Sequence, residues 1–278
     1  MPRLPVEVAD LVRAAGERFI ETSRSWLSGQ HLKVLSAISR CRTAELGAHR
    51  IRCEDCDHSP PLVYNSCLNR HCPKCQAGTR KRWLEARRKE LLGVRYLHVV
   101  FRLPRVLSQR ALQNKAAIYS LLMRASAQTL LEVARDPRHL GAAIGFFSIL
   151  HTWNQRLQEH AHVHTVVSAG GLSLDHSRWI DAPSKNFFLP KQVLAEVFRG
   201  KFIDGLNKAF VQGELGFYGR FASLNRKPAF KAFVRTLYRS KWVVEVRPPF
   251  GGPGKALEYL SRYTHRVAIS NQRLVSFE

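Results

Sequence analysis

The sequence has no run of about 18 apolar residues, so it predicts no transmembrane helix. Residues 1 to 23 mix acids with apolar side chains and lack the apolar centre of a signal peptide, which excludes an export signal. We therefore expect a cytoplasmic protein. In that reducing compartment the six cysteines are expected to be metal ligands or free thiols rather than disulfides.

Acidic residues are also scarce, with 21 Asp and Glu against 44 Lys and Arg, which gives a net charge of +23. A chain this basic attracts polyanions, and the two candidates are a phosphate backbone and an anionic membrane surface. No apolar segment supports the membrane, so nucleic acid is the favoured partner. At 278 residues, 45% of them hydrophobic, the chain is long enough for one large or two small domains.

Histidines alternate along the stretch EHAHVHTVVSAGG, residues 159 to 171, which then enters a β-branched run typical of a buried strand. Alternate side chains of a strand point to one face, so His160, His162 and His164 are expected on one side of a sheet. Two neutral imidazoles about 7 Å apart on such a face can share one metal ion. The alternative is that one or two of them are ordinary polar-face histidines.

Cysteines occur in two C-x-x-C pairs, Cys53 with Cys56 and Cys72 with Cys75, which fifteen residues separate. This spacing predicts a tetrahedral zinc site with four thiolate ligands, and the alternative is two unrelated thiol pairs. Four protein thiolates leave no open coordination position, so the zinc would be structural. Removing it is expected to unfold the region around residues 53 to 75.

Other potential zinc ligands lie close by in the sequence. Cys67 and His71 belong to the same loop and could substitute for one of the four thiolates. Cys41, His49 and His58 are interpreted as bystanders.

A basic helix is predicted directly after the second cysteine pair, in GTRKRWLEARRKELL. Two basic triplets seven residues apart fall on similar helix faces and are expected to contact DNA phosphates, although a solvated basic face is the common alternative. The candidate DNA-binding residues in this helix are Arg80, Lys81, Arg82, Arg87 and Arg88.

The rest of the chain alternates helical and strand patterns. Helices are expected over residues 6 to 38, 106 to 134, 141 to 158, 191 to 212 and 228 to 239. Strands are expected over residues 94 to 103 and 241 to 248, with short ones around 179 to 180 and 187 to 188 and a turn at Gly170-Gly171. His98 lies in the first of these strands. A single His there is more often part of the core or sheet face than a ligand, but it could pair with the central histidines if the two strands are neighbours.

Two tyrosines follow a Gly- and Pro-rich loop, in KALEYLSRYTHR. Tyr259 and Tyr263 are four residues apart, so on a helix their phenols share a face. A phenol is a weak nucleophile, but nearby cations and a metal that polarises the electrophile would activate it. Tyrosines at this spacing in isolation are more often core residues. The cations expected to contact DNA here are Lys255, Arg262 and Arg266.

Metal-binding histidines, activated phenols and a DNA-binding charge together indicate transesterification at a phosphate. The metal, Mg²⁺ or Mn²⁺, would hold a non-bridging oxygen and stabilise the charge that develops there. One tyrosinate would attack, leaving a 5′-phosphotyrosine and a free 3′-hydroxyl.

The chain resembles the rolling-circle transposases of the insertion-sequence ninety-one type, in the two-tyrosine HUH endonuclease superfamily. The motifs that carry the resemblance occur in order: YNSCLNRHCPKCQ, HVVFRLP, TWNQRLQEHAHVHTVVSAGG and YLSRYTHR. It implies an α+β fold in which residues 1–92 form a helical, zinc-binding, DNA-binding region. Residues 93–278 would then form an HUH-type antiparallel sheet flanked by helices.

The same resemblance implies roles for individual residues. His162 and His164 would bind the catalytic metal and Tyr259 and Tyr263 would be the nucleophiles. Gln155 and His160 also fall on motif positions, as a third ligand or an orienting group. The implied activity is nicking and transfer of single-stranded DNA at transposon ends, in the cytoplasm of a bacterium.

Two features depart from the family pattern. Ala161 stands where the family would have Pro, and the chain ends at Glu278, within what looks like another strand, so the catalytic sheet is expected to be incomplete. The other functions weighed are a non-catalytic zinc-ribbon DNA-binding protein and a relaxase or plasmid replication initiator. The cysteine pairs ahead of the histidines favour the transposase.

Overall fold

The computed structural model describes residues 6–277 except 51, 54, 57, 59, 60, 155–157, 184–188, 248–251, 265, 266 and 268. For residues 253, 256, 260 and 262–264 it describes the backbone alone. The chain forms two compact units, one of residues Met1–Ala86 with Ser261–Glu278 and one of residues Arg87–Leu260. Among the described residues, no helix combines the length and apolarity needed to cross a bilayer.

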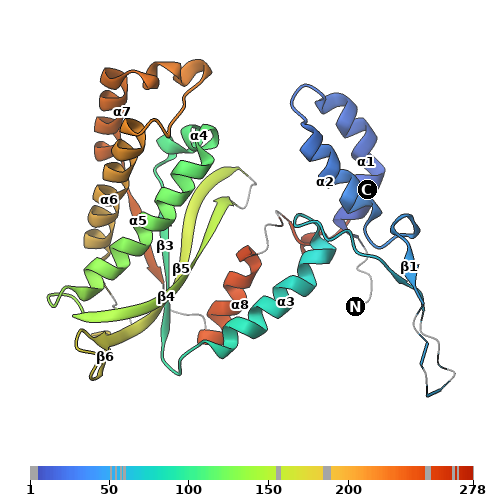
Figure 1. Ribbon diagram of the computed structural model, residues 1–278, viewed down its shortest axis with the longest axis horizontal. Helices are drawn as coiled ribbons and strands as arrows, with labels where there is room; N and C mark the ends of the chain where they lie inside the picture. Colours follow the sequence, from blue (N-terminus) through green and yellow to red (C-terminus); the bar gives the residue numbers. More distant parts are fainter. Residues whose placement is uncertain are drawn as a thin grey trace. The chain divides into compact units, whose positions relative to one another are not determined.

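Two helices pack together at the start of the first unit, α1 (Val8–Ser23) and α2 (Gly29–Arg40), as predicted for residues 6 to 38 (Figure 1). The Glu7 side chain takes part in a capping box at the start of α1, and Ser28 caps α2 by accepting a hydrogen bond from the His31 backbone. Their apolar contact with the rest of the unit is a small cluster of buried residues, namely Ala9, Ile38, Cys41 and Cys72.

The rest of the first unit is mostly irregular. It contains the short helix η1 (Ala44–Leu46), the two-residue strands β1 (Ala48–His49) and β2 (Val63–Tyr64), most of α3 (Pro73–Lys89), and η3 (Asn271–Arg273). The backbone N–H of Val8 donates to the Asn271 side chain, which ties the last residues of the unit to its first helix. With so few buried apolar residues, this unit needs another source of stability.

An antiparallel sheet of five strands forms the centre of the second unit (Figure 1). Its strands are β3 (Tyr96–Arg102), β4 (Ala142–Trp153), β5 (Glu159–Ser173), β6 (Trp179–Asp181) and β7 (Val243–Arg247). The order is β4-β5-β3-β7, with β6 paired to the end of β5. The histidine strand β5 therefore lies in the interior of the sheet, as an α+β HUH-type fold predicts.

One face of this sheet is apolar and packs against helices. Val99, Phe101 and Val163 on that face join one large core with residues of α5 and α6. The helices of the unit are α4 (Arg105–Gln113), α5 (Lys115–Arg135), α6 (Lys191–Val211), η2 (Gly219–Asn225), α7 (Lys227–Arg239) and the first part of α8 (Pro253–Thr264). The next residues along each strand, including His98 and His164, point to the opposite face.

Strand β4 corrects the helix predicted for residues 141 to 158. Residues 142–153 form a twelve-residue strand paired along β5, with a register shift between Ile144 and Phe146. The run FFSILHTW is apolar enough to fit either structure, and pairing with β5 decides in favour of the strand.

The expected turn at Gly170-Gly171 is wrong as well, because β5 runs straight through both glycines to Ser173. A Cβ at Gly171 would lie 2.3 Å from the Ala143 carbonyl oxygen, so a glycine is required at this point of the pairing between β4 and β5. The short strand expected around residues 187 to 188 lies outside the described residues.

Candidate functional site: a histidine cluster and a cysteine cluster

Three histidines meet on the face of the sheet opposite the helical core. His162 on β5 pairs directly with His151 on β4, and His164 is the next residue on the same face of β5. Each of the three contributes one ring nitrogen to a group in which all such atoms lie within 4.8 Å of one another. All three are buried, with His162 8% exposed and His164 6%. This is the arrangement of imidazoles that a divalent metal ion requires.

Hydrogen bonding fixes which nitrogen of His162 faces the cluster. Its Nδ1 lies 2.6 Å from the backbone carbonyl oxygen of His160, and because a carbonyl only accepts, Nδ1 must carry the proton. The other nitrogen, Nε2, is then unprotonated and lies 3.1 Å from Nδ1 of His151. Adjacent donor atoms of a metal with bonds of about 2.1 Å are separated by about this distance.

A fourth histidine, His98, supports His164 from the neighbouring strand β3. His98 Nε2 and His164 Nδ1 share a hydrogen bond of 2.8 Å, and the two rings stack at 5.0 Å. The condition under which His98 could pair with the central histidines is met, because β3 pairs with β5. A bond to Nδ1 leaves Nε2 of His164 as the nitrogen that would bind metal.

Burial keeps these imidazoles neutral. Loss of solvation lowers the pKa of His98, His151 and His162 to about 4. It lowers the pKa of His164 to about 2, with the charges of the three neighbouring histidines as the next causes. A neutral imidazole is the form that binds metal, so the cluster is in its ligating state at neutral pH.

Tyr259 of α8 lies against this cluster. Its ring centre is 5.4 Å from that of His98 and 6.3 Å from that of His164, with an edge-to-face arrangement in each case. The two segments that sequence analysis singled out, 159–171 and 255–266, therefore bring a phenol and the imidazoles together within the second unit. A phosphate bound by the histidines would lie next to this phenol.

The remaining residues predicted at this site have varied positions. His160 is half-buried and its ring is 5.2 Å from that of His162, but it is not one of the three clustered histidines. Lys255 is exposed on α8. Gln155 and Arg266 lie outside the described residues, and Tyr263 and Arg262 are described in their backbone alone.

His151 is the residue that sequence analysis missed. It lies in the segment predicted to be a helix, where it had no reason to approach His162. Had residues 142–153 been interpreted as a strand antiparallel to β5, the pairing of His151 with His162 would have followed from the register.

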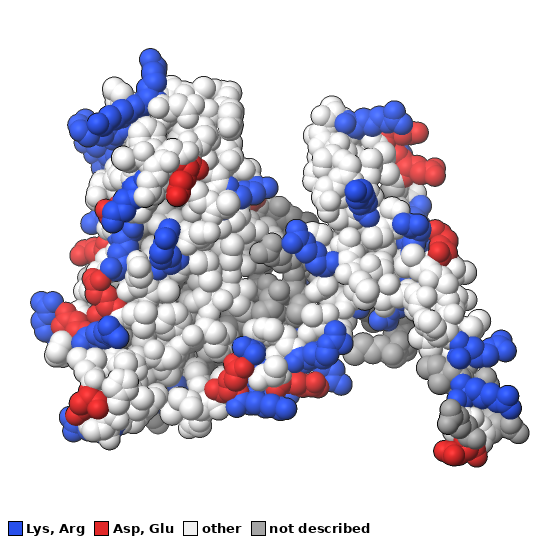
Figure 2. Space-filling model, in the orientation of Figure 1, with Lys and Arg blue, Asp and Glu red and all other residues white. Residues whose placement is uncertain are grey.

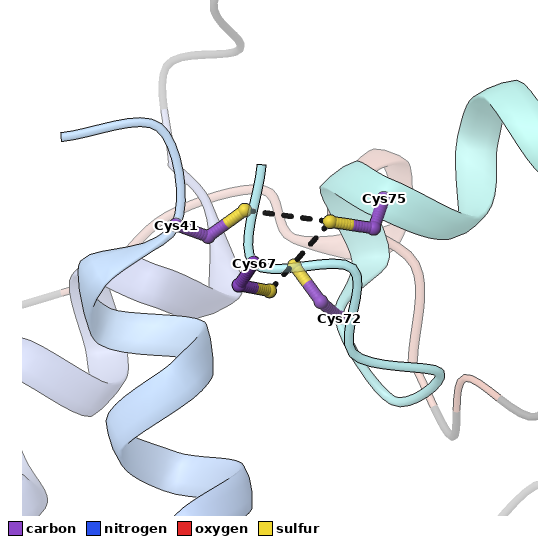
Figure 3. A group of neighbouring side chains, drawn as sticks. All are labelled: Cys41, Cys67, Cys72 and Cys75. Atoms are coloured by element: carbon purple, nitrogen blue, oxygen red, sulfur yellow. Dashed lines mark hydrogen bonds between the residues drawn. The ribbon is translucent and has the colours of Figure 1, made fainter. Parts of the chain in front are cut away.

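The first unit holds a second cluster, made of four cysteines: Cys41, Cys67, Cys72 and Cys75 (Figure 3). Their sulfur atoms lie within 4.8 Å of one another, and Sγ of Cys75 is 3.5 Å from that of Cys41 and 3.6 Å from that of Cys67. A tetrahedral zinc ion with Zn–S bonds of about 2.3 Å separates its sulfurs by about 3.8 Å. The observed spacing fits that geometry.

This grouping differs from the predicted pairing. Cys72 and Cys75 are in the cluster, but it contains Cys41, which was expected to be a bystander, and Cys67 in place of Cys53 and Cys56. The chain between the pairs brings Cys67 to the cluster, and the end of α2 delivers Cys41. Hydrogen bonds, first from the Asp55 backbone and then from Cys56, lower the pKa of the Cys53 thiol.

Without a cation, Cys67 and Cys72 resist ionisation, whereas hydrogen bonds from neighbouring cysteines lower the pKa of Cys41 despite its burial. Burial raises the pKa of Cys67 to about 11 and raises that of Cys72 still further, where the neighbouring thiols Cys41 and Cys75 add to the effect. A divalent ion at the centre would reverse this, because it stabilises the thiolates directly. The donor set and the geometry therefore both suit zinc.

Some side chains of the basic triplets of α3 form hydrogen bonds or ion pairs with nearby residues. Arg80 donates to the Ser261 hydroxyl at 2.8 Å, and Arg87 forms an ion pair with Glu90 at 2.7 Å. Lys81, Arg82 and Arg88 are exposed. Lys89 is exposed as well, whereas Lys81 lies 4.0 Å from Glu85 and Arg82 donates to the Thr79 hydroxyl at 3.4 Å.

Comparison with known proteins was made on both the sequence and the fold. A family model described as "Putative transposase" matches residues 145–278. A second, described as "Transposase zinc-binding domain", matches residues 11–103. The first covers β5 and Tyr259, and the second covers all four clustered cysteines.

Two curated relatives match across most of the chain. One, named "Putative transposase y4qJ", from Sinorhizobium fredii (strain NBRC 101917 / NGR234), is 49% identical over 278 residues, which are 100% of this chain and 69% of that protein. The other, from Pseudomonas savastanoi pv. phaseolicola, is named as the transposase for insertion sequence element IS801. It is 26% identical over 248 residues, 88% of this chain and 58% of that protein.

Solved structures with a related arrangement are complexes of the conjugative relaxase TrwC. A metal-bound complex with oriT DNA is 18% identical and covers 64% of this chain and 67% of that chain, with a TM-score of 0.36. A complex with a 27-mer DNA is also 18% identical and covers 50% and 54%, with a TM-score of 0.33. These scores are too low to carry an argument.

Proposed function

Because this chain belongs to the transposases of the insertion-sequence ninety-one type, we propose that it nicks single-stranded DNA at transposon ends and transfers the strand through a covalent tyrosine–DNA bond. The observation that carries this proposal is the position of Tyr259, whose ring lies 6.3 Å from that of His164 at the edge of the histidine cluster. A nucleophile and an electrophile-binding site must be this close for in-line attack.

In the proposed reaction the Tyr259 oxygen attacks the phosphorus of the scissile phosphate. The new bond is a 5′-phosphotyrosine, the bond to the 3′ oxygen breaks, and the proton lost by the phenol is balanced by one taken up at the leaving oxygen. Neither water nor ATP is consumed, because the phosphotyrosine keeps the energy of the phosphodiester for rejoining. Tyr263 is proposed as the second nucleophile on the same helix.

We assign the catalytic metal to His151, His162 and His164, with Mg²⁺ or Mn²⁺ as the working ion. Bound there, the ion would hold a non-bridging oxygen of the phosphate and neutralise the charge that develops in the transition state. By this means the histidines would hold the phosphate beside Tyr259. Arg102, which pairs with His162 in the β3–β5 register, lies on the same face, where it forms an ion pair with Glu245 at 2.6 Å.

His98 is proposed as a positioning residue. Its hydrogen bond to Nδ1 of His164 fixes the orientation and tautomer of that ring, which is the usual task of a partner to a metal-binding histidine. It does not have to touch the metal to affect the reaction.

Structural zinc is assigned to Cys41, Cys67, Cys72 and Cys75. The ion would link the end of α2 to the start of α3 and so hold together a unit whose apolar core is small. Its role would be structural, since four thiolates leave no position for a substrate.

The experiment uses labelled single-stranded oligonucleotides that carry the two ends of the insertion element, incubated with the protein and Mn²⁺. We expect a covalent protein–DNA adduct on a denaturing gel, at least 10²-fold reduced by Tyr259→Phe with Tyr263→Phe together and by His162→Ala with His164→Ala. Tyr218→Phe is the matched control, because that tyrosine is exposed in another segment of the chain. An adduct that survives the double tyrosine change ends the proposal. DNA binding with no adduct under any metal would instead favour a non-catalytic zinc-containing DNA-binding protein.

A further inference from the structure

Helix α7 carries a cation at every fourth position: Lys227, Lys231, Arg235 and Arg239. We call these four residues the α7 stripe. Residues four apart are neighbours on a helix surface, so the four side chains form a row that runs obliquely along α7 and turns about 40° at each step. All four are exposed, and Figure 2 shows Lys and Arg side chains gathered over this part of the second unit. Neither the metal sites nor the predicted DNA-binding residues include them.

The helix that carries the stripe is packed against the core. The other side of α7 buries Phe230, Phe233, Val234 and Leu237, which belong to the large core of the second unit. A helix anchored in this way cannot rotate or bend to move its cations apart. Their spacing is therefore fixed before any partner arrives.

Helix stability does not explain the stripe. Lys227 lies in the first turn, where the helix dipole disfavours positive charge, and no acid occurs in that turn. The four cations also form three consecutive like-charge pairs at i,i+4 spacing, each of which destabilises a helix. Arg239 in the last turn suits the helix dipole, but the first three cations have no such local advantage, and their presence on one exposed surface indicates a function.

No acid nearby neutralises the stripe. No ion pair involves any of its four members among the described residues, whereas cations on other helices of the unit are paired, as Lys201 is with Glu132 and Lys208 with Asp204. Between Glu214 and Glu245 the sequence contains no acid at all. The charge of the stripe is thus available to an external anion.

We propose that the α7 stripe binds the phosphate backbone of double-stranded DNA. The proposal rests on the proposed function and adds a second DNA surface to it. Twelve residues of helix span about 18 Å, which is the rise of about five base pairs at 3.4 Å each. A row of cations of that axial length, on a helix anchored in the core, matches the phosphates along one side of a duplex.

A duplex fits this surface better than a single strand does. Single-stranded DNA is usually held by exposed aromatic rings on which bases stack. The exposed aromatic residue of α7 is Tyr238, which lies beside the stripe. Its ring already has a partner, because the Arg199 guanidinium lies over it, 6.0 Å from the ring centre. The stripe itself contains only cations, which position a backbone without reading its sequence.

The experiment measures binding of the full chain to a fluorescent 20-base-pair duplex and to a 20-nucleotide single strand, across a series of salt concentrations. In the variant with Lys227, Lys231, Arg235 and Arg239 all changed to Gln, we expect duplex affinity to fall at least tenfold at 0.1 M salt. The slope of log affinity against log salt should become shallower by about 3.6, or 0.9 for each lost phosphate contact. The single changes Lys231→Gln and Arg235→Gln should each make the slope shallower by about one quarter of that change, or about 0.9.

A control of equal charge has Lys115, Arg124, Arg135 and Lys191 changed to Gln, which are exposed cations scattered over α5 and the start of α6. It should keep most of the duplex affinity and slope. Equal losses in the two quadruple variants, or no loss in the stripe variant, would overturn the proposal, and so would a loss confined to the single strand. A thermal melt checks that each variant is folded. Adduct formation, measured separately, reports on the proposed function itself, so its failure is distinguished from failure of the stripe.

Discussion

The cysteine cluster makes a sharp prediction, because the sequence and the structure select different ligands. The sequence spacing selects Cys53 and Cys56 as partners of Cys72 and Cys75, whereas the structure places Cys41 and Cys67 beside them. The perturbation is therefore Cys41→Ser, with Cys53→Ser as its matched control. Both remove one thiol and change the volume very little.

The size of the effect follows from the small apolar core of the first unit. Ile38 is the one large aliphatic side chain among its four buried cluster residues, and its burial contributes about 3 kcal/mol at most. Structural zinc contributes about 10–16 kcal/mol in small zinc domains, or roughly 3 kcal/mol for each of four ligands. Losing one thiolate should therefore cost about as much as the largest apolar contact supplies.

Zinc content and protease sensitivity are the measurements. We expect wild type and Cys53→Ser to hold one zinc ion per chain and to resist limited proteolysis between residues 41 and 75. Cys41→Ser should hold less zinc and be cleaved in that segment at least tenfold faster, as should wild type treated with a chelator. Added Mg²⁺ should not restore resistance, because a hard ion does not replace zinc among thiolates.

The opposite pattern would refute this reasoning. If Cys53→Ser loses zinc while Cys41→Ser keeps it, the C-x-x-C pairing expected from the sequence is the real site. If chelation changes the protease sensitivity of neither variant nor wild type, zinc has no structural role in this unit.

Three further predictions concern the second unit. His98→Phe should weaken Mn²⁺ or Ni²⁺ binding about tenfold by calorimetry, with His98→Gln closer to wild type, because an amide can still bond to Nδ1 of His164; equal affinities would remove the positioning role. The pKa values of the clustered histidines are lowered from 6.5 to about 4 or less, so the unfolded chain binds more protons below pH 6.5. The unfolding free energy of metal-free protein should thus be fully present above pH 6.5 and fall toward pH 4, by at most about 1.4 kcal/mol per pH unit for each histidine, and His151→Gln should show a shallower fall. Gly171→Ala should destabilise the protein by about 1–3 kcal/mol in urea unfolding, because its Cβ would meet the Ala143 carbonyl. As the control, Gly200→Ala has open space around it and should stabilise α6 by about 1 kcal/mol. Similar effects at both sites would contradict the requirement for glycine where β5 pairs with β4.

Much of the second unit could be predicted from local patterns. The alternating histidines and the β-branched run after them define β5, and the apolar periodicity of residues 191 to 212 and 228 to 239 defines α6 and α7 closely. The pattern of FFSILHTW failed because apolar residues follow one another there, although β4 is a strand at the edge of the sheet. Its periodicity is then no different from that of a buried helix.

Both metal-binding groups expose the same limit of sequence spacing. Spacing identifies ligands that a single turn or strand holds together, such as Cys72 with Cys75 and His162 with His164. The other ligands arrive from elements that only tertiary packing brings close. Cys41 ends the α2 helix and is 26 residues before Cys67 in the chain. The pair Cys53 and Cys56 is nearer to Cys72 and Cys75 in the sequence and has the regular C-x-x-C spacing, so spacing alone selects it.

The register of the sheet shows how the missing ligand can be recovered without a structure. In an antiparallel pair of strands the numbers of partner residues have a constant sum until a bulge intervenes. From the pairing of Phe146 with Val167 through that of His151 with His162, the sum is 313 throughout. Once residues 142–153 are taken as a strand that faces β5, His151 is the histidine on β4 that falls opposite His162. A metal ion beside these residues would thus be held by two strands, which fixes its position relative to the sheet and so relative to Tyr259.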